Sequence, residues 1–339
     1  MKAIIPAAGI GKRLQPHTLN RPKVMVPVAG KPILEHISQS LFNVGFDEIS
    51  VIVGYKKETI IDHFNKKYPG KFKFPVQKEM KGLGHAILYG LDDVEDPALI
   101  ILGDTIIDLD MSQLMHPEHN VLAVMEVEDP GRFGIVETDN GGMITQMVEK
   151  PERFIGNLAI AGAYYIQSQR KLKAAIEKLI KNNIKTRNEY QLTDALVDML
   201  NAGEPFRALP IKEWYDCGTM ETLLSTSNYL LSKGSMNKGA CENCTIIDPV
   251  YVGEGTVLKN STIGPFAAIG NNVLIEDSKI QESMINNHAV IKKSELKNSI
   301  IGYRSKIKNI SGNLNIGDDE TVAGDQEKAP SDLPPVVEN

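Results

Sequence analysis

The chain has 339 residues, 42% of them hydrophobic and 24% charged, and a formal net charge of −6. This length predicts two domains, and the composition is that of a globular protein, whereas the acidic balance excludes nucleic acid as the main partner. Three cysteines and the lack of a long apolar run predict a cytoplasmic protein with no membrane partner.

From residue 1 to about residue 235, short β-branched runs alternate with amphipathic stretches. This pattern is typical of βαβ units, and it predicts the α/β class: a Rossmann-like, mostly parallel sheet flanked by helices. The predicted strands are 2–6, 49–54, 98–103, 121–127 and 161–166. The predicted helices, with apolar residues at three- and four-residue spacing, are 33–45, 57–68, 84–93, 170–182 and 191–203.

After about residue 245, apolar residues recur every five or six positions. Neither a helix nor a plain strand has this period, which is typical of a hexapeptide β-helix with one inward apolar side chain per rung. We therefore expect a β-helix over 245–317 and a disordered acidic tail over 318–339. The repeating residues are Val252, Leu258, Ile263, Ile269, Ile275, Ile280, Ile285, Ile291, Leu296, Ile301 and Ile307.

The loop after the first predicted strand reads AAGIGKRLQP and combines small residues with cations. It is not a P-loop, because Arg13 follows Gly11 and Lys12, and it lacks the third glycine of the dinucleotide motif, where Leu14 stands. Small residues let backbone N–H groups approach a base and a phosphate, and Arg13 and Lys23 would neutralise phosphate charge. A tight turn with solvated cations is the alternative.

Two aspartates end apolar strands in distant parts of the chain. Asp104 lies in LGDTIID and Asp216 in EWYDCGT. Mg²⁺ is commonly held by one or two carboxylates together with substrate phosphates, so the pair predicts a shared Mg²⁺ site. In isolation, each aspartate also fits a helix cap or a turn.

Two further segments carry groups for a sugar and a base. Glu149 and Lys150 suit a phosphorylated sugar, since the carboxylate binds hydroxyls and the ammonium binds phosphate; an exposed ion pair is the alternative. Gln77 can pair with a base edge through its donor and its acceptor, and Gly82 would let the backbone approach the same base. We interpret His85 as a structural or capping residue.

In this order, the segments resemble the sugar nucleotidyltransferases, also called nucleotide-sugar pyrophosphorylases. PAAGIGKRLQPHT and PKVMVPVAGKPILEH resemble the family signature GxGxRLxPxT followed by PKxxxPVxxKP, and the likeness continues through VEKPE, EYQLTDAL and WYDCGT. It covers about residues 1–235, which would form the catalytic domain. The C-terminal repeat resembles the left-handed β-helix of the long form of glucose-1-phosphate thymidylyltransferase, and the thymidylyl- or uridylyltransferase type is the closest match.

The resemblance implies roles for the residues at matching positions. The residues that would bind the nucleotide are Ala8, Gly9, Gly11, Lys12, Gln77 and Gly82. Those that would bind the sugar phosphate are Gly134, Glu149, Lys150 and Asn157. Those that would carry catalysis by holding phosphates and offsetting charge are Arg13, Lys23 and Lys150. Mg²⁺ would be ligated by Asp104 and Asp216.

The implied reaction joins a nucleoside triphosphate, dTTP or UTP, to a sugar 1-phosphate, with glucose 1-phosphate favoured, and releases pyrophosphate. One alternative is a catalytically silent regulatory or scaffold member that binds nucleotide sugars. Another is a bifunctional enzyme whose β-helix transfers an acyl group with a histidine such as His288. The flat faces of β-helix coils predict a homo-oligomer.

Overall fold

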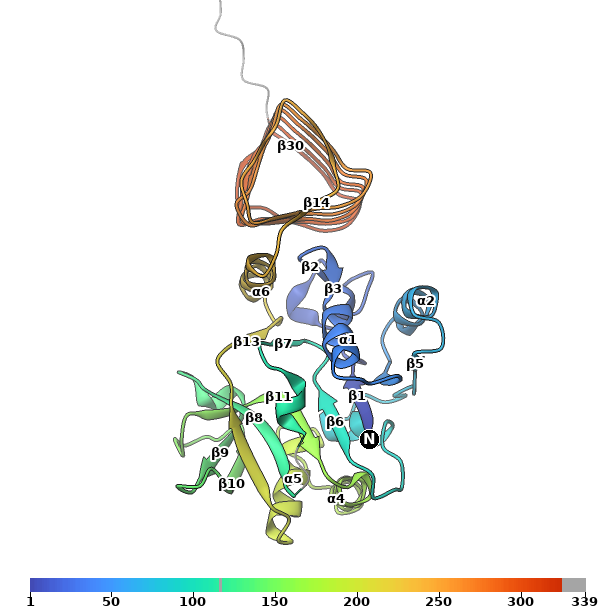
Figure 1. Ribbon diagram of the computed structural model, residues 1–339, viewed down its shortest axis with the longest axis vertical. Helices are drawn as coiled ribbons and strands as arrows, with labels where there is room; N and C mark the ends of the chain where they lie inside the picture. The colour runs from blue at the N-terminus through green and yellow to red at the C-terminus, as the bar shows by residue number, and fades with distance from the viewer. Residues whose placement is uncertain (116–117, 325–339) are drawn as a thin grey trace, which may run out of the picture. The chain divides into compact units, whose positions relative to one another are not determined.

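The computed structural model describes residues 1–115 and 118–324 (Figure 1). The chain divides into two compact units between Thr226 and Ser227. Within the described ranges, every helix is too short or too polar to cross a membrane. The first unit is an α/β domain and the second is a parallel β-solenoid, so the fold class expected from the sequence is confirmed.

The first unit is built on a nine-stranded mixed sheet with the order β10-β9-β11-β6-β1-β4-β5, in which β8 pairs with β11 and β12. The strands from β6 to β5 are parallel, and β11 is antiparallel to its neighbours. All five predicted strands form. The bounds are β1 (Lys2–Pro6), β4 (Ile49–Ile52), β5 (Phe72–Lys73), β6 (Ala98–Ile101), β8 (Asn120–Glu126), β9 (Gly134–Thr138), β10 (Ile144–Glu149), β11 (Leu158–Ile166) and β12 (Phe206–Pro210).

The five predicted helices also form, and a sixth follows β13 (Trp214–Asp216). Helix α3 ends at Leu88, earlier than expected, because the chain turns at Gly90. Gly90 also lies close to β1, since a Cβ there would be only 2.9 Å from Ile4. Helices α3, α4 and α5 contribute Ile87, Leu172 and Leu196 to one buried core with the sheet. The bounds are α1 (Ile33–Asn43), α2 (Lys57–Lys67), α3 (Leu83–Leu88), α4 (Gln169–Lys181), α5 (Leu192–Asn201) and α6 (Met220–Ser232).

Strand β1 lies at the switch point of the sheet, where the order in which strands are added reverses. It pairs in parallel with β4 on one side and with β6 on the other. The chain runs outward from β1 to β4 and β5 and then returns to β6, so the connections diverge at the carboxyl end of β1. Ligands of open α/β sheets bind in the crevice at such a switch point. The cation-bearing loop after Pro6 starts at this place.

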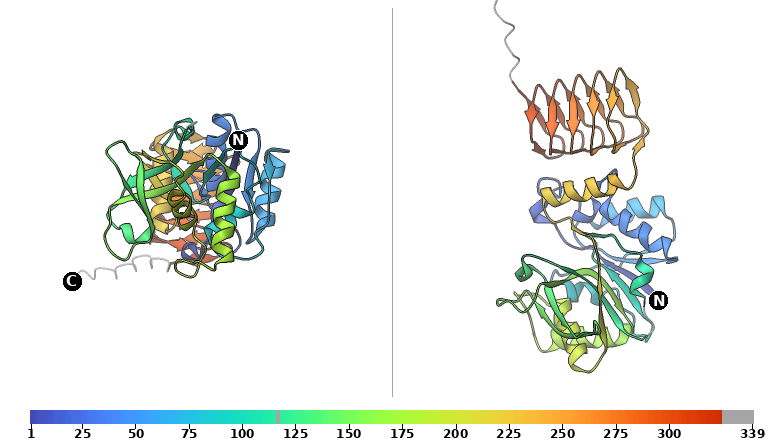
Figure 2. Two further views of the ribbon diagram at one scale, coloured as in Figure 1. Left: turned by 90° about the horizontal axis from the view of Figure 1, so that it is seen from below. Right: turned by 60° about the vertical axis from the view of Figure 1, so that its left-hand side comes forward.

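The second unit consists of three parallel sheets wound into stacked turns, as Figure 2 shows. One sheet contains β14 (Met236–Asn237), β17 (Val250–Val252), β20 (Ala267–Ile269), β23 (Ser283–Ile285), β26 (Ile300–Ile301) and β29 (Asn315–Ile316). The next contains β15 (Ala240–Glu242), β18 (Val257–Lys259), β21 (Leu274–Glu276), β24 (Val290–Lys292), β27 (Lys306–Lys308) and β30 (Thr321–Ala323). The third contains β16 (Thr245–Ile246), β19 (Thr262–Ile263), β22 (Lys279–Gln281), β25 (Glu295–Lys297) and β28 (Ser311–Gly312).

The eleven repeating apolar residues predicted to point inward are all at most 2% exposed. The corners between the strands use left-handed backbone, with φ of 53° at Asn272, 62° at His288 and 58° at Arg304. His288 therefore lies at an ordinary corner, in the position that asparagine and arginine take in neighbouring turns. Asparagine is common in this series because it tolerates the left-handed region better than most residues.

The solenoid is longer than the expected range 245–317. Its first turn starts at Met236, and its last described strand, Thr321–Ala323, pairs with β27. The terminal turns were missed because most of their residues are exposed, although Ile316 and Val322 continue the inward positions of Ile301 and Ile307. Residues 318–324 of the expected tail therefore belong to the solenoid, and residues 325–339 lie outside the described residues.

Candidate active site

The loop after β1 has a shape that only glycine allows at one position. Gly11 has a φ of 73°, and a Cβ there would lie 2.7 Å from the Cβ of Lys23. Thr18 Oγ1 donates a hydrogen bond of 2.8 Å to Gly11 O and holds the loop in place. Gly9 differs, because a Cβ there would meet nothing within 4 Å. The protein itself does not require glycine at position 9, so the open space beside it is available to a ligand.

The two predicted metal-ligand aspartates lie side by side. Strand β13 (Trp214–Asp216) pairs antiparallel with β7 (Thr105–Ile107), which places Asp216 opposite Thr105, and Cys217 N donates to Asp104 O at 3.0 Å. The backbone ladder therefore brings together two carboxylates that are far apart in the sequence.

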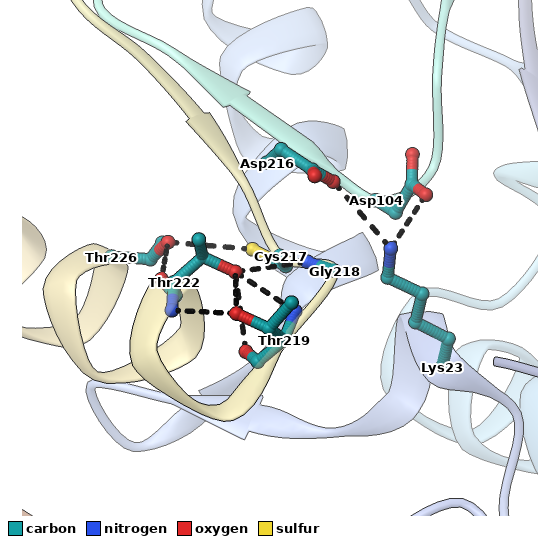
Figure 3. Close-up of polar contacts among 8 residues, drawn as sticks. All are labelled: Lys23, Asp104, Asp216, Cys217, Gly218, Thr219, Thr222 and Thr226. Atoms are coloured by element: carbon teal, nitrogen blue, oxygen red, sulfur yellow. Dashed lines mark hydrogen bonds and ion pairs between the residues drawn. The ribbon is translucent and has the colours of Figure 1, made fainter. Parts of the chain in front are cut away.

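A lysine ammonium faces both carboxylates (Figure 3). Lys23 Nζ lies 2.7 Å from Asp104 Oδ2 and 3.7 Å from Asp216 Oδ1, and the lysine side chain is only 11% exposed. This geometry shows that the carboxylates converge on one cationic position. Two hard oxygen ligands of this kind suit Mg²⁺ when substrate phosphates complete the coordination. Within residues 1–115 and 118–324, no cluster of three or more histidine, cysteine or acidic side chains could hold a metal alone.

Arg13 reaches the same place from the loop after β1. A Cβ on Gly218 would lie 2.7 Å from Asp216 Oδ2 and 3.1 Å from Arg13 Nη2. The guanidinium of Arg13 and the carboxylate of Asp216 therefore both lie close to the same side of Gly218. Gly218 was not among the predicted site residues, although it lies only two positions after Asp216 in the sequence.

A network of hydroxyl groups holds the segment that carries Asp216 (Figure 3). Thr222 Oγ1 accepts hydrogen bonds from Gly218 N at 3.1 Å and from Thr219 N at 2.9 Å, while Thr222 N donates to Thr219 Oγ1 at 3.3 Å. This reciprocal pairing resembles a capping box and fixes the start of α6. Burial raises the pKa of Cys217 to about 12, so its thiol stays protonated and donates to Thr226 Oγ1.

The predicted sugar-binding residues meet around the β9–β10 pair. Gly134 lies opposite Glu149, and a Cβ on this glycine would lie 2.8 Å from Thr193 Oγ1 and 3.1 Å from Glu149 Oε2. Glu149 is bound on both sides: Oε1 lies 2.8 Å from Lys150 Nζ, and Oε2 accepts from Thr193 Oγ1 at 2.7 Å. Asn157 lies just before β11 and is exposed.

Two residues near this group were missed by the sequence-based prediction. The ring of Trp214 packs edge-on against Phe133 at 4.9 Å, directly before Gly134. Its buried Nε1–H has no acceptor in the described part of the chain, so it can donate to a ligand. The second missed residue is Asp194, whose pKa is raised by burial and by the charge of Glu149. The signal for Trp214 was present, because the only tryptophan of the sequence stands two residues before Asp216.

The predicted base-binding residues follow neighbouring parallel strands. Ala8 follows β1, and its carbonyl accepts from Tyr55 N after β4 at 3.2 Å. Gln77 N donates to Val53 O, which places this glutamine at the same edge of the sheet. Gly82 has a structural role that the sequence did not indicate: a Cβ there would lie 2.6 Å from the carbonyl oxygen of Tyr190.

Cations and carboxylates thus meet where the parallel strands of an α/β sheet end, as in enzymes that act on phosphorylated substrates. Within that class, the chain belongs to the nucleotidyl transferase family, whose model matches residues 2–233.

Several proteins are similar to this chain. The bifunctional protein GlmU of Methanocaldococcus jannaschii is 40% identical over 260 residues, which are 76% of this chain and 61% of that protein. The UTP–glucose-1-phosphate uridylyltransferase AglF of Haloferax volcanii is 34% identical over 222 residues, 63% of this chain and 89% of that protein. The crystal structure of a UDP-glucose pyrophosphorylase complexed with UDP-glucose gives a TM-score of 0.59 at 29% identity, covering 69% of this chain and 99% of that chain.

Proposed function

We propose that this protein transfers a nucleotidyl group from UTP or dTTP to a sugar 1-phosphate, with glucose 1-phosphate favoured, and releases pyrophosphate. The observation that carries the proposal is the convergence of Lys23 with Asp104 and Asp216, beside Arg13, at the switch point of the sheet. The names of the relatives, a uridylyltransferase among them, support the same reaction.

The nucleotide would bind along the loop after β1. The base would lie beside Ala8 and Gly9, where Gly9 has open space next to it, and the amide of Gln77 would offer it one donor and one acceptor. Gly11, Lys12 and Arg13 would follow the triphosphate, and the side chains of both cations are exposed.

The site fits a magnesium ion. Asp104 and Asp216 would hold it, because their carboxylates already converge on a cationic position and two carboxylates leave room for phosphate oxygens. Bound there, Mg²⁺ would neutralise charge on the triphosphate. Lys23 would then pair with a phosphate, since its ammonium lies within reach of the same position.

The transfer itself needs positioning and charge neutralisation. A phosphate oxygen of the sugar 1-phosphate attacks the α-phosphorus in line, the bond to the β-phosphate breaks, and pyrophosphate leaves. No protein nucleophile is required, because the attacking phosphate is already ionised. Arg13 and Lys23 would offset the charge that develops on the α-phosphate and on the departing pyrophosphate, which in a preorganised site is a large part of catalysis.

The sugar phosphate would bind beside β9 and β10. Lys150 would hold the phosphate, while Glu149 would accept hydrogen bonds from sugar hydroxyls. The contacts of Glu149 with Lys150 and Thr193 fix its carboxylate for that role. Gly134 and Asn157 would border the sugar, and the unpaired N–H of Trp214 supplies a further donor.

The solenoid is proposed to join copies of the chain into a homo-oligomer. Its first and last described turns leave strand edges without a neighbour in the same sheet, and such edges favour pairing. Light scattering on the whole chain and on a chain truncated before β14 tests this, since loss of the oligomer is expected only on truncation.

A grid of UTP, dTTP, GTP, ATP and CTP against several sugar 1-phosphates, with Mg²⁺ and read by pyrophosphate release, tests the function. We expect release with UTP or dTTP and a hexose 1-phosphate. Binding of a nucleotide sugar without pyrophosphate release from any pair would instead indicate the silent scaffold. Acetyl transfer to an amino-sugar phosphate, assayed with acetyl-CoA, would indicate a second activity in the solenoid.

A further inference from the structure

The side chains of Gln77 and His85 meet in the interior beside the proposed base site. Gln77 Nε2 lies 3.2 Å from His85 Nδ1, and the two residues are 5% and 9% exposed. Gln77 follows the bridge between Val53 and Val76, whereas His85 lies in the first turn of α3. A hydrogen bond between two buried groups is costly to lose, so the glutamine amide is held by this contact.

The imidazole is suited to accept this hydrogen bond. Burial lowers the pKa of His85 below its usual value, the Lys81 charge lowers it further, and Glu79 opposes both. At neutral pH the ring is therefore uncharged, with one N–H and one lone pair. The amide nitrogen of Gln77, which faces Nδ1, can only donate a hydrogen bond. The lone pair on Nδ1 then accepts from Gln77.

The direction of the Gln77 amide decides which pyrimidine it fits. Uracil and thymine present an N–H donor at N3 and an acceptor at O4, so they need the amide oxygen at N3 and the amide nitrogen at O4. Cytosine presents an acceptor at N3 and a donor at N4, so it needs the amide turned by half a rotation. A glutamine free to turn would accept both kinds of base.

We propose that His85 fixes the direction of the Gln77 amide and thereby makes the enzyme select uridine or thymidine nucleotides over cytidine nucleotides. His85 is a positioning residue, because it acts through Gln77, and the inference rests on the proposed function. The bond to Nδ1 keeps the amide nitrogen on the histidine side. The carbonyl oxygen and the second N–H then face the base in one order only, which opposes the cytosine edge.

The test compares three variants of the whole chain with the parent protein. His85→Phe keeps a ring but removes the acceptor, His85→Leu removes both, and His85→Asn places an acceptor oxygen near the position of Nδ1. For each, kcat/KM with UTP and with CTP is measured by pyrophosphate release, and binding of both nucleotides is measured by calorimetry. We expect the UTP-to-CTP ratio to fall about tenfold in the phenylalanine and leucine variants, mainly through better use of CTP, and to stay close to the parent value with asparagine.

Equal losses for UTP and CTP in a folded phenylalanine variant would show a purely structural role and overturn the proposal. A ratio as low with asparagine as with leucine would also overturn it, because the acceptor would then not matter. Circular dichroism and thermal unfolding identify a variant that fails to fold, and the remaining variants still decide the question. If the parent protein releases no pyrophosphate with any nucleotide, the proposed function fails, whereas the calorimetric UTP-to-CTP ratio still tests the role of His85.

Discussion

Asp216 lies opposite Thr105 across the β7–β13 ladder, and the next backbone amide, that of Cys217, donates to Asp104 O. Main-chain hydrogen bonds therefore bring the two carboxylates together, in addition to the ion pairs that both make with Lys23. Changing either carboxyl group should leave the ladder intact, so its effect on metal use can be measured in a folded protein.

Asp104→Asn and Asp216→Asn should each raise the Mg²⁺ concentration needed for half-maximal activity, because each removes one charged oxygen ligand. The measurement is a Mg²⁺ titration of turnover at saturating substrates. Asp110→Asn is the matched control, since Asp110 is an aspartate on the same stretch of chain that caps a turn through Ser112 N. An unchanged midpoint in both site variants would contradict the metal roles.

Arg13→Ala should lower turnover about a hundredfold, by analogy with removing one preorganised donor that stabilises developing charge. Arg13 is exposed, so the thermal unfolding midpoint should change little. Arg13→Lys keeps the charge without the planar fork and should lose less activity than the alanine variant. Turnover close to that of the parent in a folded Arg13→Ala protein would remove this residue from the mechanism.

Thr222→Val should weaken both the start of α6 and the placement of Asp216. The loss of the hydroxyl leaves Gly218 N and Thr219 N without their acceptor, which should cost about 1 kcal/mol of stability and raise the Mg²⁺ midpoint. Thr222→Ser should restore both quantities. Ser225→Ala, on an exposed neighbour in the same helix, serves as control. Lower stability with an unchanged Mg²⁺ midpoint would limit Thr222 to a helix cap.

Glu35 should make the protein sensitive to acid. Burial alone would raise its pKa, but hydrogen bonds from His63 and Lys67 outweigh burial and lower the pKa from 4.5 to about 2. Because the folded-state pKa is the lower one, the carboxylate contributes fully above pH 4.5, on the order of 3 kcal/mol, and this contribution is lost as the pH falls from 4.5 toward 2.

Urea unfolding of the parent and of Glu35→Gln between pH 7 and pH 3 measures this contribution. The difference in free energy of unfolding should be largest at neutral pH and shrink below pH 4.5. Asp47→Asn is the control, because the side chain of Asp47 is 97% exposed and its ion pair with Lys71 should contribute little. A difference that stays constant with pH would show that the ion pair is not the source of the stability.

The sequence predicted the parts of the fold that depend on periodicity. The inward positions of the solenoid and the strands around β1 follow from apolar spacing, because burial repeats with the geometry of each element. It also predicted a site shared by Asp104 and Asp216, and the β7–β13 pair brings these two carboxylates close together. The terminal solenoid turns were missed because most of their residues are exposed, although Ile316 and Val322 continue the repeat.

Contacts between distant segments were not predictable in the same way. The close approach of Gly82 to Tyr190 and the contact between His85 and Gln77 depend on how separate loops and helices meet. Spacing within one segment carries no information about a partner elsewhere in the chain. Trp214 is different, because a rare residue beside a predicted ligand could have been chosen from the sequence alone.

The solenoid is a one-dimensional stack in which each strand pairs only with the equivalent strands of the turns before and after it. Such a stack can gain or lose a complete coil without disturbing the rest. An inserted coil makes with each neighbouring coil the same contacts that those two coils made with each other. Evolution can therefore change the length of this region in whole coils, and relatives of very different total length can retain the same nucleotidyl transferase unit.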